Sequence, residues 1–542
     1  MSRKSVKNSI DHYQRARLCF VQTMSAFADK PSTIHFLKDL NVVDLIVPLL
    51  ADKVPSIQHA ALATLGKLMC AKHVDIRQEV LERNLVALVL KDLTKQNKHY
   101  KKTALHMLTC VAQQDERCAG LIEDKDLDSI ISSLHDFDPD TRANAALALG
   151  GLAKDNKHFA ERIVQCGALP PLVQILASPQ LSLKHAAAFA LDGIVKHSPE
   201  LAESASDCDV IPLLIKALNN DEVNVKADAF LCLADIAKDS PSLASTIADG
   251  ATTLAVEHLT YPHGLVQKNA ATLLRDMCKH NLRLANLVVL AGGLDGLLRL
   301  IDCNGGYNSL PAIMALGYMS AQSEQIAEQI IELQGVGSLQ TILQCPHKEQ
   351  LQVAAAWTLG QIGKHSVDNV TALCEENVLS TLLSKITQTC VSDNLKSKCK
   401  NALNILIPKC ENPKELEQML LGNVSEELLA SILCAFAKIL PCDPVARRSF
   451  VTSHCLRKVQ EIEPTPEIAP HLKTINACFP NEVIHFVSPH YLEDLINRLD
   501  QFNPQKSSNL PDCKDSGSGN PSGSAQSLQR SEASTTSTAS IY

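Results

Sequence analysis

Hydrophobic residues recur along most of this chain with the period of an α-helix. Segment 223–238, VNVKADAFLCLADIAK, shows the pattern clearly, because one apolar face collects Val225, Ala229, Phe230, Leu233, Ile236 and Ala237. Segment 210–220, VIPLLIKALNN, predicts a second helix before it. A shorter helix opens at Ser198-Pro199-Glu200, where Ser is a good N-cap and Pro suits the first turn. The pattern therefore predicts a unit of one short helix, a corner and two longer helices.

The corner between the first two helices recurs along the chain at spacings of 41 to 43 residues. Asn, Asp and Gly enter the left-handed backbone region most readily, and a left-handed residue is how many helices end and turn. The nine expected corners are Asn41, Asn84, Asp126, Gly167, Asp209, Gly250, Gly292, Gly335 and Asn377.

A leucine in the third helix of each unit recurs with the same period. These leucines are Leu65, Leu108, Leu149, Leu191, Leu233, Leu274, Leu316 and Leu359. Repeats near 40 residues made of helices belong to the armadillo and HEAT solenoids, and three helices per unit favour the armadillo form. We therefore predict an all-α, right-handed armadillo-repeat solenoid of about eight to ten repeats.

The regularity of the pattern divides the chain into four regions. Residues 1–40 read as N-terminal capping helices, 41–410 as regular armadillo repeats, and 411–503 as degenerate C-terminal repeats and a cap. Residues 504–542 are rich in Ser, Gly and Thr and almost free of large apolar side chains, which predicts a disordered tail. This tail is either a phosphorylation substrate or a segment with no regulated role.

Composition narrows the range of functions that this chain can have. The formal net charge is −8, so an overall basic footprint for nucleic acid is absent. Nineteen cysteines without a CxxC motif indicate reduced thiols inside the cell. The opening segment lacks a secretory signal, and the longest apolar stretch, 284–301, is interrupted by polar residues and by the Gly292-Gly293 corner. We expect a cytoplasmic protein with no membrane span.

We find no motif for enzymatic chemistry. Phosphate-binding loops, dinucleotide fingerprints, zinc-protease motifs and nucleophile elbows are all missing, so we expect no catalytic residue, cofactor, metal or small-molecule substrate. Segment 136–140, DFDPD, resembles the start of a calcium loop, but Thr141 stands where that loop needs Gly, which favours a polar turn and an Asp-Pro helix start. Lys-His pairs at His197, His280 and His365 recur at the end of the third helix and suggest structural capping.

Two sets of positions are candidates for partner binding. A basic ladder near the start of the third helix contains Lys101, Arg142, Lys184 and Lys226. It is either a stripe for acidic segments, such as tubulin tails, or a solvated helix start whose aliphatic stems cover the core edge.

The second set follows from comparison with nuclear-import armadillo proteins, which line their groove with Trp and, four residues later, Asn. The Asn position here holds Lys67, Cys110, Gly151, Gly193, Asp235, Asp276, Tyr318 and Gln361, and Trp357 is the single Trp. A nuclear import carrier is therefore not expected. We instead predict that Asp235, Asp276, Tyr318 and Gln361 contact other protein partners.

Several segments resemble one family more closely than the generic repeat. They are YQRARLCFVQTMSAFADKP, KHSPELAE, QKNAATLLRDMCKH, ALGYMSAQSEQIAEQI, AAAWTLGQIGKHS, RRSFVTSHCLRKVQEIE and CFPNEVIHFVSPHYLEDLINRLDQFNP. They are similar to the sperm-associated antigen 6 / PF sixteen family, armadillo-repeat proteins of the axonemal central apparatus. The resemblance runs from about residue 10 to 504. Asn41 and Asp209 stand where the family has Gly, and 66–130 are more divergent, as in a divergent paralogue or orthologue.

The resemblance implies a non-enzymatic structural role in the axoneme of motile cilia and sperm flagella. The implied partners are other central-apparatus proteins, with the acidic tails of tubulin as a further partner. The implied location is the cytoskeleton of the cilium or flagellum. The alternative is a general cytoplasmic adaptor for signalling or cargo.

Overall fold

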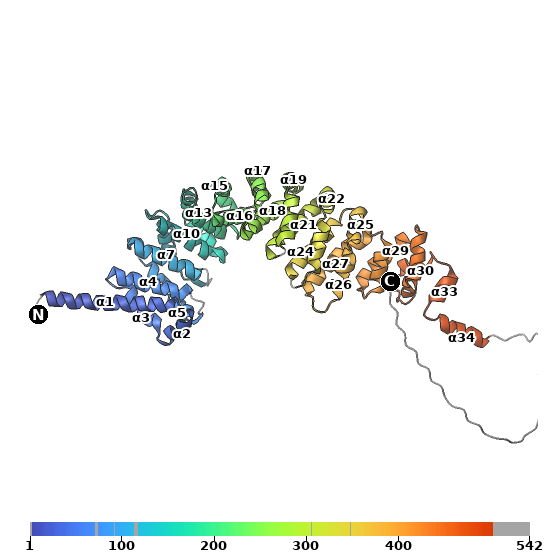
Figure 1. Cartoon of the computed structure of the whole chain (residues 1–542), viewed down its shortest axis with the longest axis horizontal. Coiled ribbons are helices and arrows are strands. Elements are labelled where there is room, and N and C mark those ends of the chain that lie inside the picture. Colours follow the sequence, from blue (N-terminus) through green and yellow to red (C-terminus); the bar gives the residue numbers. More distant parts are fainter. Residues whose placement is uncertain are drawn as a thin grey trace, which may run out of the picture.

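The computed structural model describes residues 3–70, 74–91, 93–112, 117–304, 306–346 and 348–501. Within these ranges the regular structure is helical, with no strand. The helices stack into one arch, which Figure 1 shows from α1 at one end to α34 at the other. The predicted tail, 504–542, lies outside the described residues.

From α2 to α27 the helices fall into successive repeats, most of them with three helices. The first helices are α2 (Ile34–Asp39), α5 (Val74–Glu82), α8 (Arg117–Gly120), α11 (Lys157–Gln165), α14 (Pro199–Ser206), α19 (Leu282–Leu290), α22 (Glu324–Glu332) and α25 (Val367–Glu375). The second are α3 (Val42–Leu50), α6 (Leu85–Leu90), α9 (Asp124–Ser133), α12 (Leu169–Leu176), α15 (Val210–Ala217), α20 (Gly293–Asn304), α23 (Gly335–Gln344) and α26 (Val378–Thr387). The third are α4 (Pro55–Cys70), α7 (Lys98–Ala112), α10 (Pro139–Lys154), α13 (Leu181–Val195), α16 (Val223–Lys238), α18 (Gly264–Cys278), α21 (Leu310–Gln322), α24 (Glu349–Ile362) and α27 (Asp393–Leu406). One unit is an exception, because α17 (Pro241–His258) takes the place of both its first and second helix.

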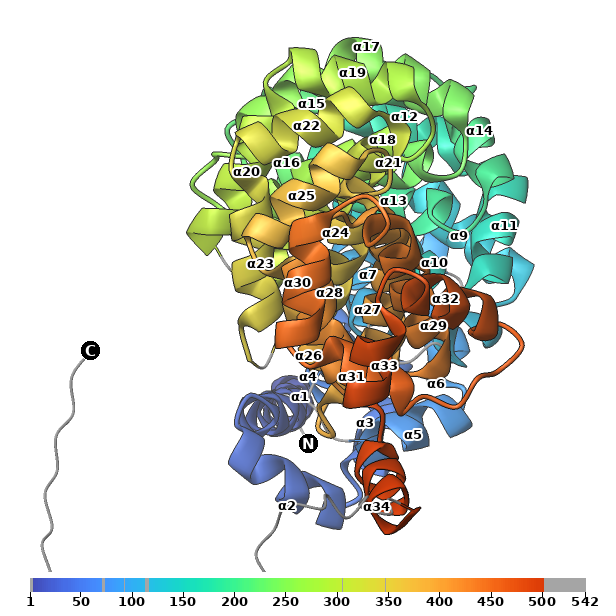
Figure 2. The same cartoon turned by 90° about the vertical axis from the view of Figure 1, so that its right-hand side faces the viewer.

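Other helices flank this array. The long helix α1 (Arg3–Ala28) precedes it, and short 3-10 turns are η1 (Pro31–Thr33), η2 (Leu93–Lys95), η3 (Tyr307–Ser309) and η4 (Ile407–Lys409). After the array come α28 (Pro413–Leu421), α29 (Glu426–Ile439), α30 (Pro444–Thr452), α31 (Cys455–Gln460), α32 (Ala469–Asn476), α33 (Asn481–Val487) and α34 (Tyr491–Gln501). Figure 2 shows the same arch turned by 90°.

The predicted corners are confirmed at six of the nine positions. Left-handed backbone occurs at Asn41, Asn84, Gly167, Asp209, Gly292 and Asn377. These residues separate a first helix from a second one, as the 42-residue period requires.

Three corners were assigned wrongly. Gly250 lies inside the continuous helix α17, so that unit has no corner there. In the unit around Gly335 the left-handed residue is the preceding one, Gln334, with φ of 60°. Asp126 is buried in the first turn of α9 and lacks a positive φ. A further left-handed residue, His454, joins α30 to α31. Left-handed corners between helices therefore also occur beyond residue 410.

The third helices form the continuous spine of the arch. Each packs mainly against the third helices of the repeats on either side, for example α10 against α13 and α16 against α18. In Figure 1 helices α18, α21 and α24 lie on the inner side of the arch, and α15, α17 and α19 on the outer side. The eight predicted core leucines all have no solvent exposure: Leu65, Leu108, Leu149, Leu191, Leu233, Leu274, Leu316 and Leu359.

The recurring histidines connect neighbouring repeats. The Nε2 atoms of His197, His280 and His365 lie 2.6, 2.7 and 2.7 Å from the carbonyl oxygens of Ala153, Ala237 and Ser320. Each carbonyl belongs to the last turns of the third helix one repeat earlier. A carbonyl only accepts, so the imidazole N–H donates. The predicted capping role is confirmed, although the capped helix belongs to the previous repeat.

The remaining local predictions have clear outcomes. Asp138 caps α10 by accepting from the backbone N–H of Thr141 at 3.0 Å, as expected for the Asp-Pro helix start. Most described cysteines are free thiols, but Cys110 is disulfide-bonded, which corrects the expectation of reduced thiols at that position.

The long apolar stretch folds as two helices. Within the described ranges, no single helix is long and apolar enough to cross a membrane. Helix α19 and residues 293–303 of α20 reach that length only together, and they are bent by 76°. The bend lies at Gly292, where φ is 80°.

Two glycines of the repeat offer a matched test of the corner. Gly292→Ala should lower the free energy of unfolding by about 1–2 kcal/mol, because a Cβ there meets no neighbour within 4 Å but opposes the left-handed backbone. Gly250→Ala, inside α17, should be neutral or stabilise by up to about 1 kcal/mol, because Ala favours helix and the nearest atom is the tip of Ile215. Urea denaturation measures both. Equal effects of the two changes would contradict the assignment.

Candidate protein-interaction surface

The basic ladder occupies equivalent places on four consecutive third helices. Each member is the fourth residue of its helix, on α7, α10, α13 and α16: Lys101, Arg142, Lys184 and Lys226. Lys101 forms an ion pair with Asp136, with Nζ 2.9 Å from Oδ2 and both side chains less than one-fifth exposed. Arg142 and Lys184 are partly exposed. The four cations are aligned, but at least two of them are engaged within the chain.

Lys226 is the second engaged cation. Its side chain is buried, and its Nζ lies 2.8 Å from His258 Nε2 and 4.8 Å from the centre of the Tyr261 ring. His258 Nδ1 lies 2.7 Å from the carbonyl oxygen of Leu254, which only accepts, so Nδ1 carries the proton and Nε2 accepts from the ammonium. Burial, together with the nearby Lys226 charge, lowers the pKa of His258 and keeps the ring neutral. The Lys226 ammonium group is therefore held inside the protein by a hydrogen bond to His258 and a cation–π contact with Tyr261.

A group of carboxylates lies next to the ladder on α13 and α16. Asp192 and Asp235 lie close enough across these two helices for the protonated carboxyl group of one to donate a hydrogen bond to the other. Burial first, and then the Asp235 carboxylate, raise the pKa of Asp192 to about 8, so at neutral pH Asp192 is the protonated donor. Burial also raises the pKa of Asp235, while the bond from Asp192 lowers it. This is a carboxylic acid–carboxylate pair that joins two repeats.

Two further aspartates extend this group. Burial raises the pKa of Asp228 to about 6, against the effect of His185, whose Nε2 lies 3.2 Å from Asp228 Oδ2 without hydrogen-bond geometry. On the next repeat, Asp276 is buried and bound in bidentate fashion by Arg275, with distances of 3.0 and 2.7 Å. Of the predicted residues, Asp235 therefore belongs to a protonated pair and Asp276 to a neutralised ion pair. Within the described ranges, no three potential ligands gather as a metal site.

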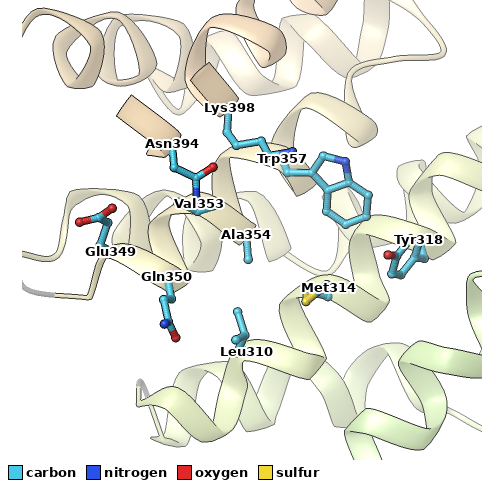
Figure 3. Close-up of a pocket in the computed structure, with 10 residues that line it drawn as sticks. All are labelled: Leu310, Met314, Tyr318, Glu349, Gln350, Val353, Ala354, Trp357, Asn394 and Lys398. Carbon is cyan, nitrogen blue, oxygen red and sulfur yellow. The ribbon is translucent and has the colours of Figure 1, made fainter. Parts of the chain in front are cut away.

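A pocket of about 590 Å³ opens where α21, α24 and α27 meet. Its apolar wall comes from Leu310 and Met314 on α21 and from Val353, Ala354 and Trp357 on α24. Figure 3 shows these side chains below Asn394 and Lys398 of α27, with Glu349 and Gln350 at one side. Tyr318, a predicted contact residue, lines the pocket, whereas Gln361 lies one helical turn beyond Trp357 and outside the lining.

The Trp357 ring is held by its neighbours. Tyr318 contacts it edge to face, with ring centres 5.0 Å apart. A Cβ at Gly317 would lie 2.2 Å from Cζ3 of Trp357, so only glycine leaves space for the indole. The adjoining Thr358 hydroxyl donates to the Ile313 carbonyl at 2.9 Å, which links α24 to α21. Trp357 is therefore a half-buried aromatic with little freedom to move, the kind of residue that contributes most to protein interfaces.

The chain matches no protein-family model. It is 38% identical over 159 residues to human sperm-associated antigen 6 and 36% identical over the same length to the mouse protein. The chain is a divergent armadillo protein similar to sperm-associated antigen 6. The match takes in 29% of this chain and 31% of each relative, so the chain spans about a third of the length of the curated relatives it matches.

One solved structure agrees with the fold. An engineered protein solved by the Northeast Structural Genomics Consortium superposes with a TM-score of 0.62 at 21% identity, over 80% of this chain and 98% of that one. A designed armadillo repeat protein matches 44% of this chain and 99% of its own, with 20% identity and a TM-score of 0.42. The first of these likenesses supports the solenoid fold alone.

Sequence reasoning missed Asp192, Asp228 and the wall of the Trp357 pocket. Asp192 and Asp228 could have been noticed as acidic residues inside Ala- and Leu-rich third helices, in ADAFL and ALDGI. The pocket could not, because its three walls come from helices about 40 residues apart, and which side chains face the same space depends on how the repeats stack.

The Asp192–Asp235 pair predicts a specific pH dependence. A folded-state pKa that is raised gives stability that is complete below the unfolded pKa, near 4, and is lost as the pH rises through about 8. Asp192→Asn keeps a donor for Asp235 without an ionisable group. Thermal unfolding should therefore show the variant more stable than the wild type by more than about 1 kcal/mol at pH 8–9, with the gap closing near pH 4. A gap independent of pH would contradict the shared proton.

Proposed function

We propose that this protein is a non-enzymatic structural scaffold of the axoneme in motile cilia or sperm flagella, where it binds other proteins of the central apparatus. The observation that supports this most is the 38% identity to sperm-associated antigen 6 over 159 residues. An elongated solenoid fits the role, because each repeat contacts mainly its neighbours and the array presents a long continuous surface.

The Trp357 pocket is the candidate docking point on this scaffold. It combines a rigid aromatic wall with polar groups at its rim, Glu349 on one side and Lys398 on the other. Such a pocket suits an apolar anchor side chain whose flanking residues pair with the rim charges. Asp235, Gln361 and the exposed parts of the basic ladder are proposed as the surface along which the rest of a partner lies. Asp276 is left out of this surface, because it is buried against Arg275.

Localisation in flagellated cells tests the proposed role directly. A tagged chain should be retained in axonemes after salt extraction. Diffuse staining and complete release by salt would favour the general cytoplasmic adaptor instead.

A variant of the pocket tests the docking point. Trp357→Ala should reduce axonemal retention several-fold, because truncating an aromatic anchor at an interface costs about 2 kcal/mol or more of binding free energy. Leu290→Ala is the matched control, since Leu290 is 83% exposed on α19, away from the pocket. Thermal melting checks that both variants are folded. Equal retention of the two would place the partner contact elsewhere.

The ladder has its own test. Lys184→Glu should weaken co-sedimentation with microtubules at low salt if the ladder meets acidic tubulin tails, and the difference should disappear at high salt. Lys216→Glu, an exposed lysine on the second helix α15, is the matched charge control. Lys226 is unsuitable, because it is buried against His258. Unchanged binding by Lys184→Glu would leave the ladder as a solvated helix start.

A further inference from the structure

Helix α34 carries an apolar stripe that remains largely exposed in the described chain. Leu492, Leu495, Ile496 and Leu499 follow the spacing of one helical face, and they are 67%, 45%, 56% and 73% exposed. No residue of this helix is buried. The outermost element of a solenoid normally presents a polar face to water. A stripe of this kind is the pattern of a helix that pairs with another helix.

Helix α1 carries a second stripe at the opposite end of the arch. Its later half is anchored, because Val21, Met24 and Ala28 are buried and the helix packs on α4. Its earlier half projects from the body, with residues 4–10 all exposed. Along that half, Val6, Ile10 and Tyr13 are 44%, 51% and 63% exposed, at the spacings of 4 and 3 residues that define a coiled-coil seam.

The two stripes carry opposite charge. Residues 4–16 of α1 contain Lys4, Lys7 and Arg15 against Asp11, a net charge of +2 from 3 − 1, while Arg17 is already paired with Asp52. Helix α34 contains Glu493, Asp494 and Asp500 against Arg498, a net charge of −2 from 1 − 3. Pairing α1 with α34 therefore joins opposite charges, whereas α1 with α1 or α34 with α34 would join like charges.

The two stripes of one molecule cannot meet. Figure 1 shows that helices α1 and α34, which carry them, lie at the two ends of the arch. A contact between them needs two copies, and it leaves one α1 and one α34 free at the outer ends. Such a contact is heterologous, so it can be repeated and produces an open chain unless the rotation closes a ring.

We propose that α34 of one copy packs along the projecting half of α1 of a second copy, so that the protein assembles head to tail. The contact is short, because the 11 residues of α34 extend only about 16 Å. An interface of this size belongs to the small, weak class, so assembly depends on protein concentration and on salt. The proposal is independent of the axonemal role, since it follows from the two helices alone.

Analytical ultracentrifugation of the full chain tests it with two single variants. Ile10→Glu breaks the α1 stripe and Ile496→Glu breaks the α34 stripe; both residues are more than half exposed, so neither change touches the core. At low salt the wild type should form dimers and longer species as its concentration rises. Each variant alone should stay monomeric, because every contact needs one intact stripe of each kind.

The equimolar mixture of the two variants distinguishes pairing of α1 with α34 from pairing of α1 with α1 or of α34 with α34. The intact α34 of Ile10→Glu can bind the intact α1 of Ile496→Glu, and the ends left over are both broken. The mixture should therefore form dimers and nothing longer. A wild type that stays monomeric at about 100 µM, well above the dissociation constant of a micromolar contact, would overturn the proposal, and so would a mixture that stays monomeric.

Two further measurements exclude trivial effects. Leu290→Glu adds the same charge at an 83% exposed leucine of α19, away from both stripes, and should assemble like the wild type. The doubly reversed variant Lys7→Glu/Glu493→Lys should retain assembly better than either single reversal, because it restores opposite charges across the contact. Assembly by Leu290→Glu as weak as that of Ile496→Glu would assign the effect to added charge and overturn the specific contact.

Discussion

The packing of each third helix between the third helices of its two neighbours is the interaction on which the rest of this structure depends. One repeat cannot bury its apolar residues alone, so stability comes from contacts between successive units. The approach is closest at the glycines of α10 and α13, where a Cβ on Gly193 would lie 2.7 Å from the Gly150 carbonyl oxygen. Alanine-rich third helices with a glycine at such points let the backbones meet, and the histidine bonds to carbonyls of the preceding repeat tie the same helices together.

This stacking also determines which polar groups meet. Third helices lie parallel and close, so residues about 42 positions apart become neighbours, such as Asp192 with Asp235. A carboxylate that would be solvated on an isolated helix then faces a second carboxylate where little water remains. Burial raises its pKa, and one proton is shared between the two groups. The Trp357 pocket has the same origin, because its indole, Tyr318 and Lys398 come from three consecutive third helices.

At each end of the arch there is no further repeat to cover the apolar residues of the terminal helix. Burial falls along α1 towards its start and is lost on α34, where the apolar stripe finds no partner within the described chain. The middle of the array is thus packed on both sides by its own repeats, whereas each terminal helix leaves an apolar stripe exposed.

The sequence by itself determined the fold class, the register of the repeats and most of the corners. These features depend on local chemistry, namely the 3.6-residue period, the caps and the residue types that accept a left-handed backbone. It failed at Asp126, Gly250 and Gly335, where the residue type was permissive but the chain had no corner or turned one residue earlier. Only the tertiary structure decided which members of the ladder are available, because Lys226 is removed from solvent by His258 and Tyr261, and it alone assembled the Trp357 pocket. A residue type determines which local backbone conformations are allowed. Which side chains meet across repeats depends on the rotation from one unit to the next, which no single repeat encodes.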